Sequence, residues 1–159
     1  MLVVIAIITL LASLVVGTAK YAQTKAARSR AEAEIAMMEL ALEHYKSDNG
    51  VYPLSTAIRD LGSGNPPGQR AINNCVLLYR ALAGGVKVYM TFKPNQLGTD
   101  PLTGNPYIVD PFGYSYNYYC NPGAADQMNQ AAYDLWSCGP GGTNEPPNSI
   151  VSNITNWKQ

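Results

Sequence analysis

The sequence opens with the apolar stretch MLVVIAIITLLASLVVG (residues 1–17) and continues as TAKYAQTKAARSRAEAEIAMMELALEHYKSD (residues 18–48). Before residue 17 only Thr9 and Ser13 are polar, and the first charged side chain is Lys20. The second stretch has no Pro or Gly and is rich in strong helix formers. Its apolar residues recur every three or four positions, as on one face of a helix: Ala27, Ala31, Ile35, Met38, Leu42 and Tyr45. The two stretches therefore predict one helix, hydrophobic over residues 1–17 and amphipathic over residues 18–48.

This helix is long for so small a protein. About 45 residues at 1.5 Å per residue give roughly 70 Å. The helix is expected to end at Ser47-Asp48-Asn49-Gly50, since Asn or Gly can adopt the left-handed conformation that closes a helix. The remaining chain is too small to cover such a helix, so its first third must be buried in lipid or in other copies of itself.

The apolar stretch by itself has three explanations. It is shorter than the roughly 20 apolar residues that a helix needs to cross a bilayer alone. It fits the core of a signal peptide cleaved near Ala19, although nothing basic precedes it. The third explanation is a membrane-stored helix whose upstream part precedes Met1. The uninterrupted helical pattern after Ala19 favours the third explanation, because a cleaved leader would be followed by a break.

Composition excludes several classes of function. The chain has 159 residues, which fits one domain, and its 11 basic and 11 acidic side chains cancel. We therefore expect no nucleic-acid partner. The only histidine, His44, lies on the long helix, and no hydrolase, zinc-protease or nucleotide-binding motif is present. The sequence predicts that the protein is not an enzyme.

Residues 49–159 predict a loop-rich globular head. A second, short helix is expected near residues 71–83, and its apolar positions are Ile72, Cys75, Leu78, Tyr79 and Leu82. Alternation of apolar and polar residues predicts a strand over residues 86–92, and two further strands are expected near 114–120 and 132–138. The expected fold class is α+β, in which the amphipathic half of the long helix packs on a small antiparallel β-sheet.

Several stretches, in this order, resemble type IV pilins and the pseudopilins of type II secretion systems. They are MLVVIAIITLLASLVV at the start, ALEHYKSDNGVYP (residues 41–53), Asp110-Pro111-Phe112-Gly113 with the tyrosines up to Tyr119, Asn121-Pro122-Gly123, residues 134–139 (DLWSCG) and Asn156-Trp157. The resemblance implies a pilin-like fold and a structural subunit that polymerises with itself and with minor pilins or pseudopilins. It also implies storage in the bacterial inner membrane with a periplasmic head, before assembly into a periplasmic pseudopilus or a surface pilus. The family's basic leader, cleavage point and glutamate would lie upstream of Met1.

The resemblance implies that the long helix forms the filament interface. The expected interface residues are Leu2, Ile5, Ile8, Leu10, Leu14, Val16, Gly17, Arg28, Arg30, Glu32 and Glu39. Gly17 stands where the family often has a helix-weakening proline. Basic residues (20–30) precede acidic residues (32–43) on the helix. They are either a solvated face with weak pairs within the helix, or bands through which staggered copies attract one another.

The family's calcium loop is not expected to function here. Major pseudopilins bind Ca²⁺ after their last strand through aspartates and backbone carbonyls, as a hard cation requires. Here the only acidic residue between positions 139 and 153 is Glu145. We predict no metal or other cofactor; the remaining candidates for a calcium loop are Cys138, Gly141, Glu145 and Asn153.

The three cysteines have two interpretations. Cys120 and Cys138 end successive predicted strands, and an exported location favours a disulfide that would close a loop of about 18 residues. The alternative is that both are buried free thiols. Cys75 is expected to be buried in the short helix.

A second function remains open at this stage. The protein could be a Sec-exported periplasmic domain that binds a glycan or a protein through surface tyrosines. The candidates crowd one predicted strand: Tyr114, Tyr116, Tyr118 and Tyr119. The alternative for these tyrosines is a strand with one face in the core. The sequence does not distinguish a secretion pseudopilus from a surface pilus.

Overall fold

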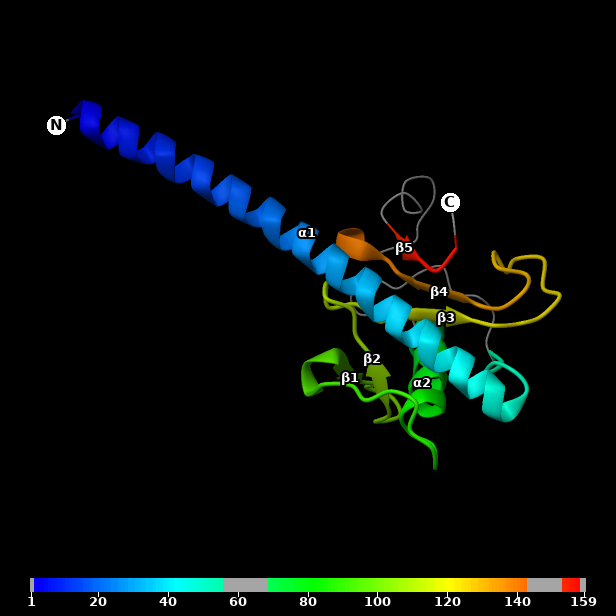
Figure 1. The fold of residues 1–159 in the computed structure, drawn as a ribbon. Coiled ribbons are helices and arrows are strands. Elements are labelled where there is room, and N and C mark those ends of the chain that lie inside the picture. The colour runs from blue at the N-terminus through cyan, green and yellow to red at the C-terminus, as the bar shows by residue number, and fades with distance from the viewer. Residues whose placement is uncertain (1, 56–68, 143–152, 158–159) are drawn as a thin grey trace.

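A computed structural model describes residues 2–55, 69–142 and 153–157; within the helices, the side chains of residues 2, 6–19 and 69–71 are not described. Its dominant element is the helix α1 (Leu2–Asn49), 48 residues long without interruption. At 1.5 Å per residue α1 extends over about 72 Å. Figure 1 shows its N-terminal half projecting away from the head, while the C-terminal half lies along it. The prediction of one long helix is confirmed.

The end of α1 follows from its last residues. Gly50 has a φ of +79°, and its N–H donates to the Lys46 carbonyl at 2.7 Å. The Asn49 side chain donates to the Tyr45 carbonyl at 2.8 Å. A glycine reaches positive φ without a steric penalty, so the chain can turn away from the helix here. The predicted stop at residues 47–50 is confirmed.

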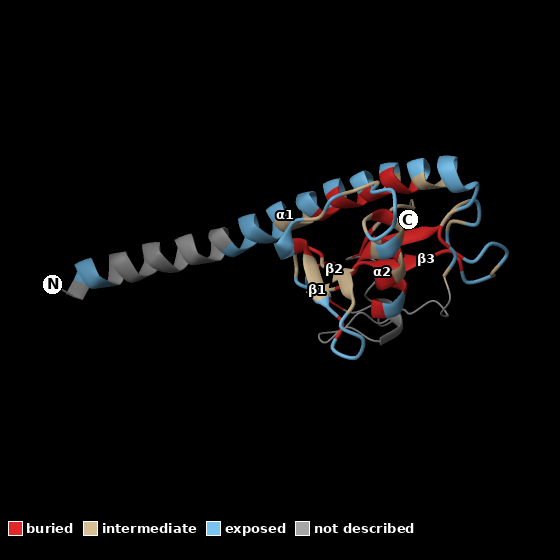
Figure 2. Cartoon of the chain, turned by 90° about the horizontal axis from the view of Figure 1, so that it is seen from below, coloured by how far each residue is buried: buried red, intermediate tan, exposed pale blue. Residues whose placement is uncertain are grey.

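The buried stripe of α1 forms one side of the main core. Ala31, Met38 and Leu42 are fully buried, and Ile35 is nearly so, as the period of the sequence predicted. Figure 2 shows this buried stripe facing the head while the opposite side of α1 is exposed. The second helix, α2 (Gln69–Leu82), adds Cys75, Leu78 and Leu82 to the same cluster. Burial of these side chains attaches both helices to the sheets.

Two small antiparallel sheets complete the head. The strands β1 (Leu97–Thr99) and β2 (Pro106–Ile108) pair with Gly98 opposite Tyr107. The strands β3 (Asn117–Tyr119), β4 (Asp134–Ser137) and β5 (Ile154–Thr155) form the second sheet in the order β3-β4-β5. Two short 3₁₀ helices, η1 (Pro94–Gln96) and η2 (Gly139–Gly141), lie next to β1 and after β4. The fold is α+β, as predicted, and the strands expected near 114–120 and 132–138 are present.

The prediction of a strand over residues 86–92 is wrong. Residues 86–92 form bends and irregular structure without strand pairing, and Val86 is fully exposed while Val88 is half exposed. The segment turns back onto the end of α2, where the N–H groups of Tyr89 and Met90 both donate to the Leu82 carbonyl. The apolar alternation reflects the packing of Tyr89, Met90 and Phe92 against the core rather than pairing with a strand.

The predicted disulfide between Cys120 and Cys138 is also wrong. All three cysteines are free and buried. In the antiparallel register Asn117 lies opposite Trp136. Cys120 lies three residues beyond Asn117 and Cys138 two residues beyond Trp136 in the opposite direction, so about 17 Å of sheet separates them. A disulfide requires Cα atoms within about 7 Å.

The two thiols also belong to different faces of the sheet. Cys120 packs in the main core, and its thiol donates to the Ala132 carbonyl at 3.4 Å. Cys138 packs with Tyr119 and Trp136 in a second cluster. The alternative interpretation, buried free thiols, is the one that the structure supports.

One further structural finding concerns the membrane. Among the residues described, no helix has both the length and the apolar character needed to cross a bilayer.

Candidate functional site

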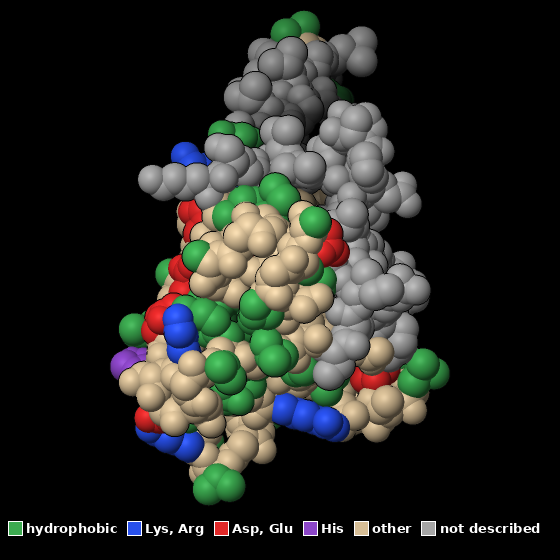
Figure 3. Space-filling view, turned by 90° about the vertical axis from the view of Figure 1, so that its right-hand side faces the viewer, with side chains coloured by type: hydrophobic (Ala, Val, Ile, Leu, Met, Phe, Trp, Pro, Cys, Tyr) green, Lys and Arg blue, Asp and Glu red, His purple; other side chains and the backbone are tan. Residues whose placement is uncertain are grey.

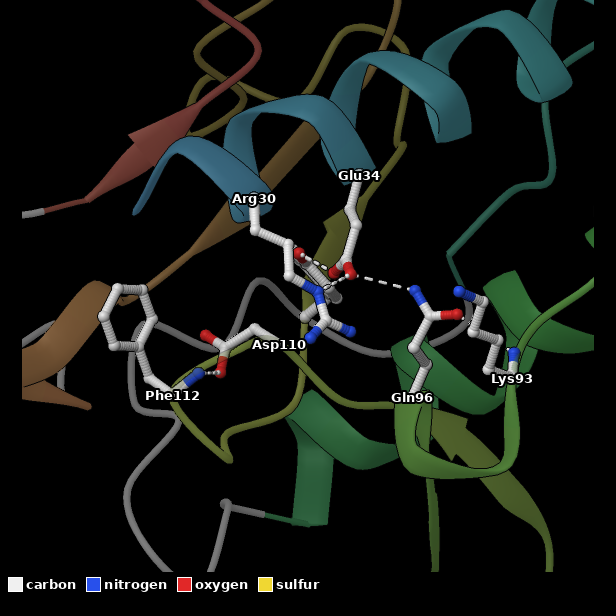
Figure 4. Close-up of polar contacts among 7 residues, drawn as sticks. Arg30, Glu34, Lys93, Gln96, Asp110 and Phe112 are labelled. Atoms are coloured by element: carbon white, nitrogen blue, oxygen red, sulfur yellow. Dashed lines mark hydrogen bonds and ion pairs between the residues drawn. The ribbon is translucent and has the colours of Figure 1, made fainter. Parts of the chain in front are cut away.

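A buried carboxylate joins α1 to the head. Glu34 is only 4% exposed, and on α1 it lies between the exposed Ala33 and the buried Ile35. It accepts hydrogen bonds from Arg30 Nε at 2.8 Å, Gln96 Nε2 at 2.9 Å and the Tyr116 hydroxyl at 2.8 Å. Figure 4 shows Arg30 and Gln96 approaching Glu34 from opposite sides. These bonds tie α1 to η1 and to the residue just before β3, so they fix how the helix lies on the head.

A second buried carboxylate organises the turn before β3. Asp110 Oδ1 accepts the N–H groups of Phe112 and Tyr114, each at 2.9 Å, and Oδ2 accepts the Ser137 hydroxyl at 2.5 Å. Burial raises the pKa of Asp110, while these donors act in the opposite direction. The bonds tie the turn at residues 110–114 to β4. Asp110 is therefore a turn residue, which is the role that a position before Pro and Gly predicts.

A groove of about 740 Å³ runs between α1 and residues 89–96. On the helix side it is lined by residues spaced three or four apart, two of which are large and apolar: Met37 is 50% exposed and Leu40 is 61% exposed. Arg30 and Lys93 contribute positive charge to its wall. We call this surface the groove flank and define it by Arg30, Ala33, Met37, Leu40, Phe92 and Lys93.

The other side of α1 is acidic. Glu32 and Glu43 are exposed and Glu39 is half-buried. Figure 3 shows acidic side chains gathered in a row along one edge of the molecule. Arg28, near this row, donates to the Asn153 carbonyl at 3.5 Å, so this side of α1 faces the end of the chain near β5. We call the surface formed by Glu32, Glu39 and Glu43 the acidic flank.

The predicted filament residues lie in different settings. Ile5 is 59% exposed, in agreement with a side chain that no part of the head covers. Arg28 lies 3.6 Å from Glu32 and Arg30 lies 2.8 Å from Glu34, so both arginines have acidic partners within their own helix. Glu39 is half-buried, and the last six predicted positions lie outside the residues whose side chains are described: Leu2, Ile8, Leu10, Leu14, Val16 and Gly17.

Three of the calcium candidates, Cys138, Gly141 and Asn153, lie near the end of β4 and the start of β5, but none of them is a carboxylate. Cys138 is buried, Gly141 is exposed in η2, and the Asn153 side chain is buried near the start of β5. Glu145 lies outside the described residues. Within the part of the chain that the structure covers, no group of three or more His, Cys, Asp or Glu side chains is arranged to hold a metal.

The tyrosine-rich strand does not form an exposed binding strip. Tyr116, Tyr118 and Tyr119 are at most 3% exposed, and the Tyr118 hydroxyl donates to the Pro53 carbonyl at 2.8 Å. Tyr114 is half-buried, with its ring over Gly142. The alternative of a surface strip of tyrosines is therefore not supported for this strand, and its tyrosines instead pack in the core.

Two of the residues that attach α1 to the head, Glu34 and Gln96, were not predicted from the sequence. Glu34 looks like one more acidic residue in a charged helix, and Gln96 lies in a loop without a motif. One signal was available: Glu34 follows Arg30 by four residues and lies at the edge of the apolar stripe, one residue before Ile35. A carboxylate at that position borders the core and requires donors from the head.

No protein-family model matches the chain, and no curated protein matches it. Among solved structures, the chain is similar to the crystal structure of the major pseudopilin from the type 2 secretion system of enterohaemorrhagic Escherichia coli. The identity is 21%, the match covers 84% of this chain and 88% of that one, and the TM-score is 0.42.

Proposed function

We propose that the protein is a structural subunit of a helical filament, a pilus or a pseudopilus. One observation supports this proposal above the others: the N-terminal half of α1 projects from the head (Figure 1) and its sequence is apolar. Val3, Val4 and Ile5 are 71%, 57% and 59% exposed in the single chain. Apolar side chains in such number gain free energy when they leave water, at roughly 25 cal/mol for each Å² buried.

Two environments can remove this half of the helix from water. In the first, the helix lies in the inner membrane and the head lies on the periplasmic side. In the second, the helices of many copies pack together and the heads form the outer surface of a filament. We propose that the protein passes from the first environment to the second, with other copies of itself and minor pilins or pseudopilins as partners. The head, held on α1 by the Glu34 contacts, would then have a fixed orientation on the filament.

The rival function, a released domain that binds through surface tyrosines, has lost its proposed site, because three of the four tyrosines are buried. N-terminal sequencing of the mature protein separates the two functions. A mature start near Lys20 would support release, whereas retention of residues 1–19 would support the filament.

The filament proposal is tested by a charge in the apolar half. Leu10→Arg and Val16→Arg each place a cation where the proposal requires an apolar contact, so we expect filaments to disappear from sheared material in electron micrographs. Leu102→Arg is the matched control, since Leu102 is 75% exposed in a head loop. Filaments of unchanged length and number in both α1 variants would contradict the proposed role of this segment.

A further inference from the structure

The two flanks of α1 differ in chemistry and face different parts of the head. The groove flank borders residues 89–96, and the acidic flank borders the chain near β5. The buried stripe of α1, with Ala31, Met38 and Leu42, lies between them. A single copy therefore presents a basic, partly apolar groove on one side and a row of carboxylates on the other.

The groove is incomplete in the single chain. Met37 and Leu40 are exposed apolar side chains in its wall, and both would lose contact with water if another helix lay along it. The Arg30 side chain remains 48% exposed despite its bond to Glu34. Lys93 is exposed, and within the described part of the chain its ammonium forms no ion pair. The groove thus offers apolar contact together with the ammonium of Lys93, whereas Arg30 is already paired with Glu34, which also lines the groove.

The acidic flank fits this groove in charge and in length. Residues 30–40, which form the helix side of the groove, extend over about 15 Å, and residues 32–43 extend over about 16 Å. Ala36 is small and exposed between the acidic residues, which allows a close approach of the helix to another surface. Opposite charges on two surfaces guide their encounter and disfavour other pairings.

We propose that the groove flank of each copy receives the acidic flank of a second copy of this chain. The inference rests on the proposed filament function and specifies its lateral contact. Because the two flanks differ, each contact leaves one groove and one acidic flank free, and such a head-to-tail contact adds copies without closing into a dimer. The helices run parallel in this arrangement, so their apolar N-terminal halves meet on the same side.

The pairing is tested by cross-linking full-length chains in the cells that produce them. One tagged copy has Leu40→Cys in the groove flank, and a second, differently tagged copy has Glu32→Cys, Glu39→Cys or Glu43→Cys in the acidic flank. A short bismaleimide should link the two tags for at least one of the three combinations; the native cysteines are buried. Leu102→Cys is the matched control for Leu40→Cys, since both leucines are more than half exposed, and it should give no link.

A charge variant adds a second measurement. Lys93→Glu places a carboxylate in the groove and should lower the cross-linked fraction by about tenfold. Arg80→Glu changes the net charge equally at an exposed position outside the groove, where Arg80 bonds to Asn105, and should leave the fraction unchanged. Equal effects of the two variants would mean that net charge, not the groove, decides the yield, and would overturn the inference.

The outcomes separate this inference from the proposed function. Filaments without links between the two flanks would overturn the pairing and leave the filament function in place. Links between two Leu40→Cys copies would indicate a closed dimer and would also overturn it. Links between the flanks without filaments would support the pairing and contradict the filament, and the absence of both would overturn both.

Discussion

Glu34 is a carboxylate with only 4% of its surface exposed, and three protein donors take the place of most of its water. Gln96 and Tyr116 come from parts of the chain 62 and 82 residues away from it. A buried carboxylate without such donors would be costly, and buried donors without the carboxylate would be costly as well. The group therefore contributes more to the orientation of α1 on the head than to any reaction.

Removal of this carboxylate gives the first prediction at the residue scale. Glu34→Ala leaves the Gln96 amide and the Tyr116 hydroxyl buried without their acceptor, and we expect the free energy of unfolding to fall by about 2 to 5 kcal/mol. Urea denaturation of the full chain in mild detergent, monitored by the fluorescence of the buried Trp136, measures this change. Glu32→Ala removes an exposed carboxylate one turn away from the core and should change it by less than about 0.5 kcal/mol. Equal losses in the two variants would contradict the role of Glu34.

Gly142 gives the second residue-scale prediction. Its φ is +65°, and a Cβ atom there would lie 2.2 Å from Cζ of Tyr114, so an alanine is both strained and blocked by the ring. Gly104 is the matched control, because its φ is +70° but nothing lies within 4 Å of the added atom. We expect Gly104→Ala to cost about 1 kcal/mol of unfolding free energy and Gly142→Ala to cost about 2 kcal/mol more. Thermal unfolding of both variants measures the difference; equal melting temperatures would show that Tyr114 does not cover Gly142.

At the scale of elements, the reactivity of the three cysteines tests whether the register of the sheet keeps Cys120 and Cys138 apart. Burial raises the pKa of Cys75 to about 12 and also raises the pKa of Cys120. We expect the folded protein to react slowly with a thiol reagent at pH 8, because the thiols are covered and these two stay protonated. In denaturant without reductant, all three should react. Detection of only one thiol under those conditions would establish the disulfide that the sheet register argues against.

The same elements show how far the sequence could predict the fold. The 3.6-residue period of apolar side chains predicted both α1 and α2, because a helix buries residues according to its own repeat. Strands depend on a distant partner, which no local pattern specifies. Val86 and Val88 are good strand formers in a segment without a partner, whereas β1 and β2 pair although each has only three residues. The disulfide prediction failed for a different reason: the C-terminal ends of two successive antiparallel strands lie at opposite ends of the pair, so the predicted antiparallel sheet already argued against it.

At the scale of the whole molecule, the candidate site also combines features that a local pattern predicts with features that depend on contacts between distant segments. The apolar half of α1 and its exposed charges were readable from the sequence, because they depend on composition along one helix. The groove was not, since Phe92 and Lys93 reach α1 only through the fold of residues 83–96. The Glu34 contacts likewise join α1 to distant segments. A surface shared by two elements becomes visible only when their packing is known.

The two halves of α1 should also be separable in the whole molecule. Residues 20–26 are exposed, and the buried stripe begins only beyond Ala27. A chain that starts at Lys20 therefore keeps every described core contact of the head, and we expect its unfolding free energy to stay within about 0.5 kcal/mol of the full chain.

The shortened chain should also lose the apolar surface that drives association. In detergent-free buffer we expect it to sediment as a monomer, while the full chain forms large assemblies or requires detergent. Sedimentation velocity and near-UV circular dichroism of both chains measure assembly and tertiary packing. A shortened chain that is unfolded would mean that residues 1–19 stabilise the head, and one that still assembles would place the main driving force for association in the head rather than in the projecting helix.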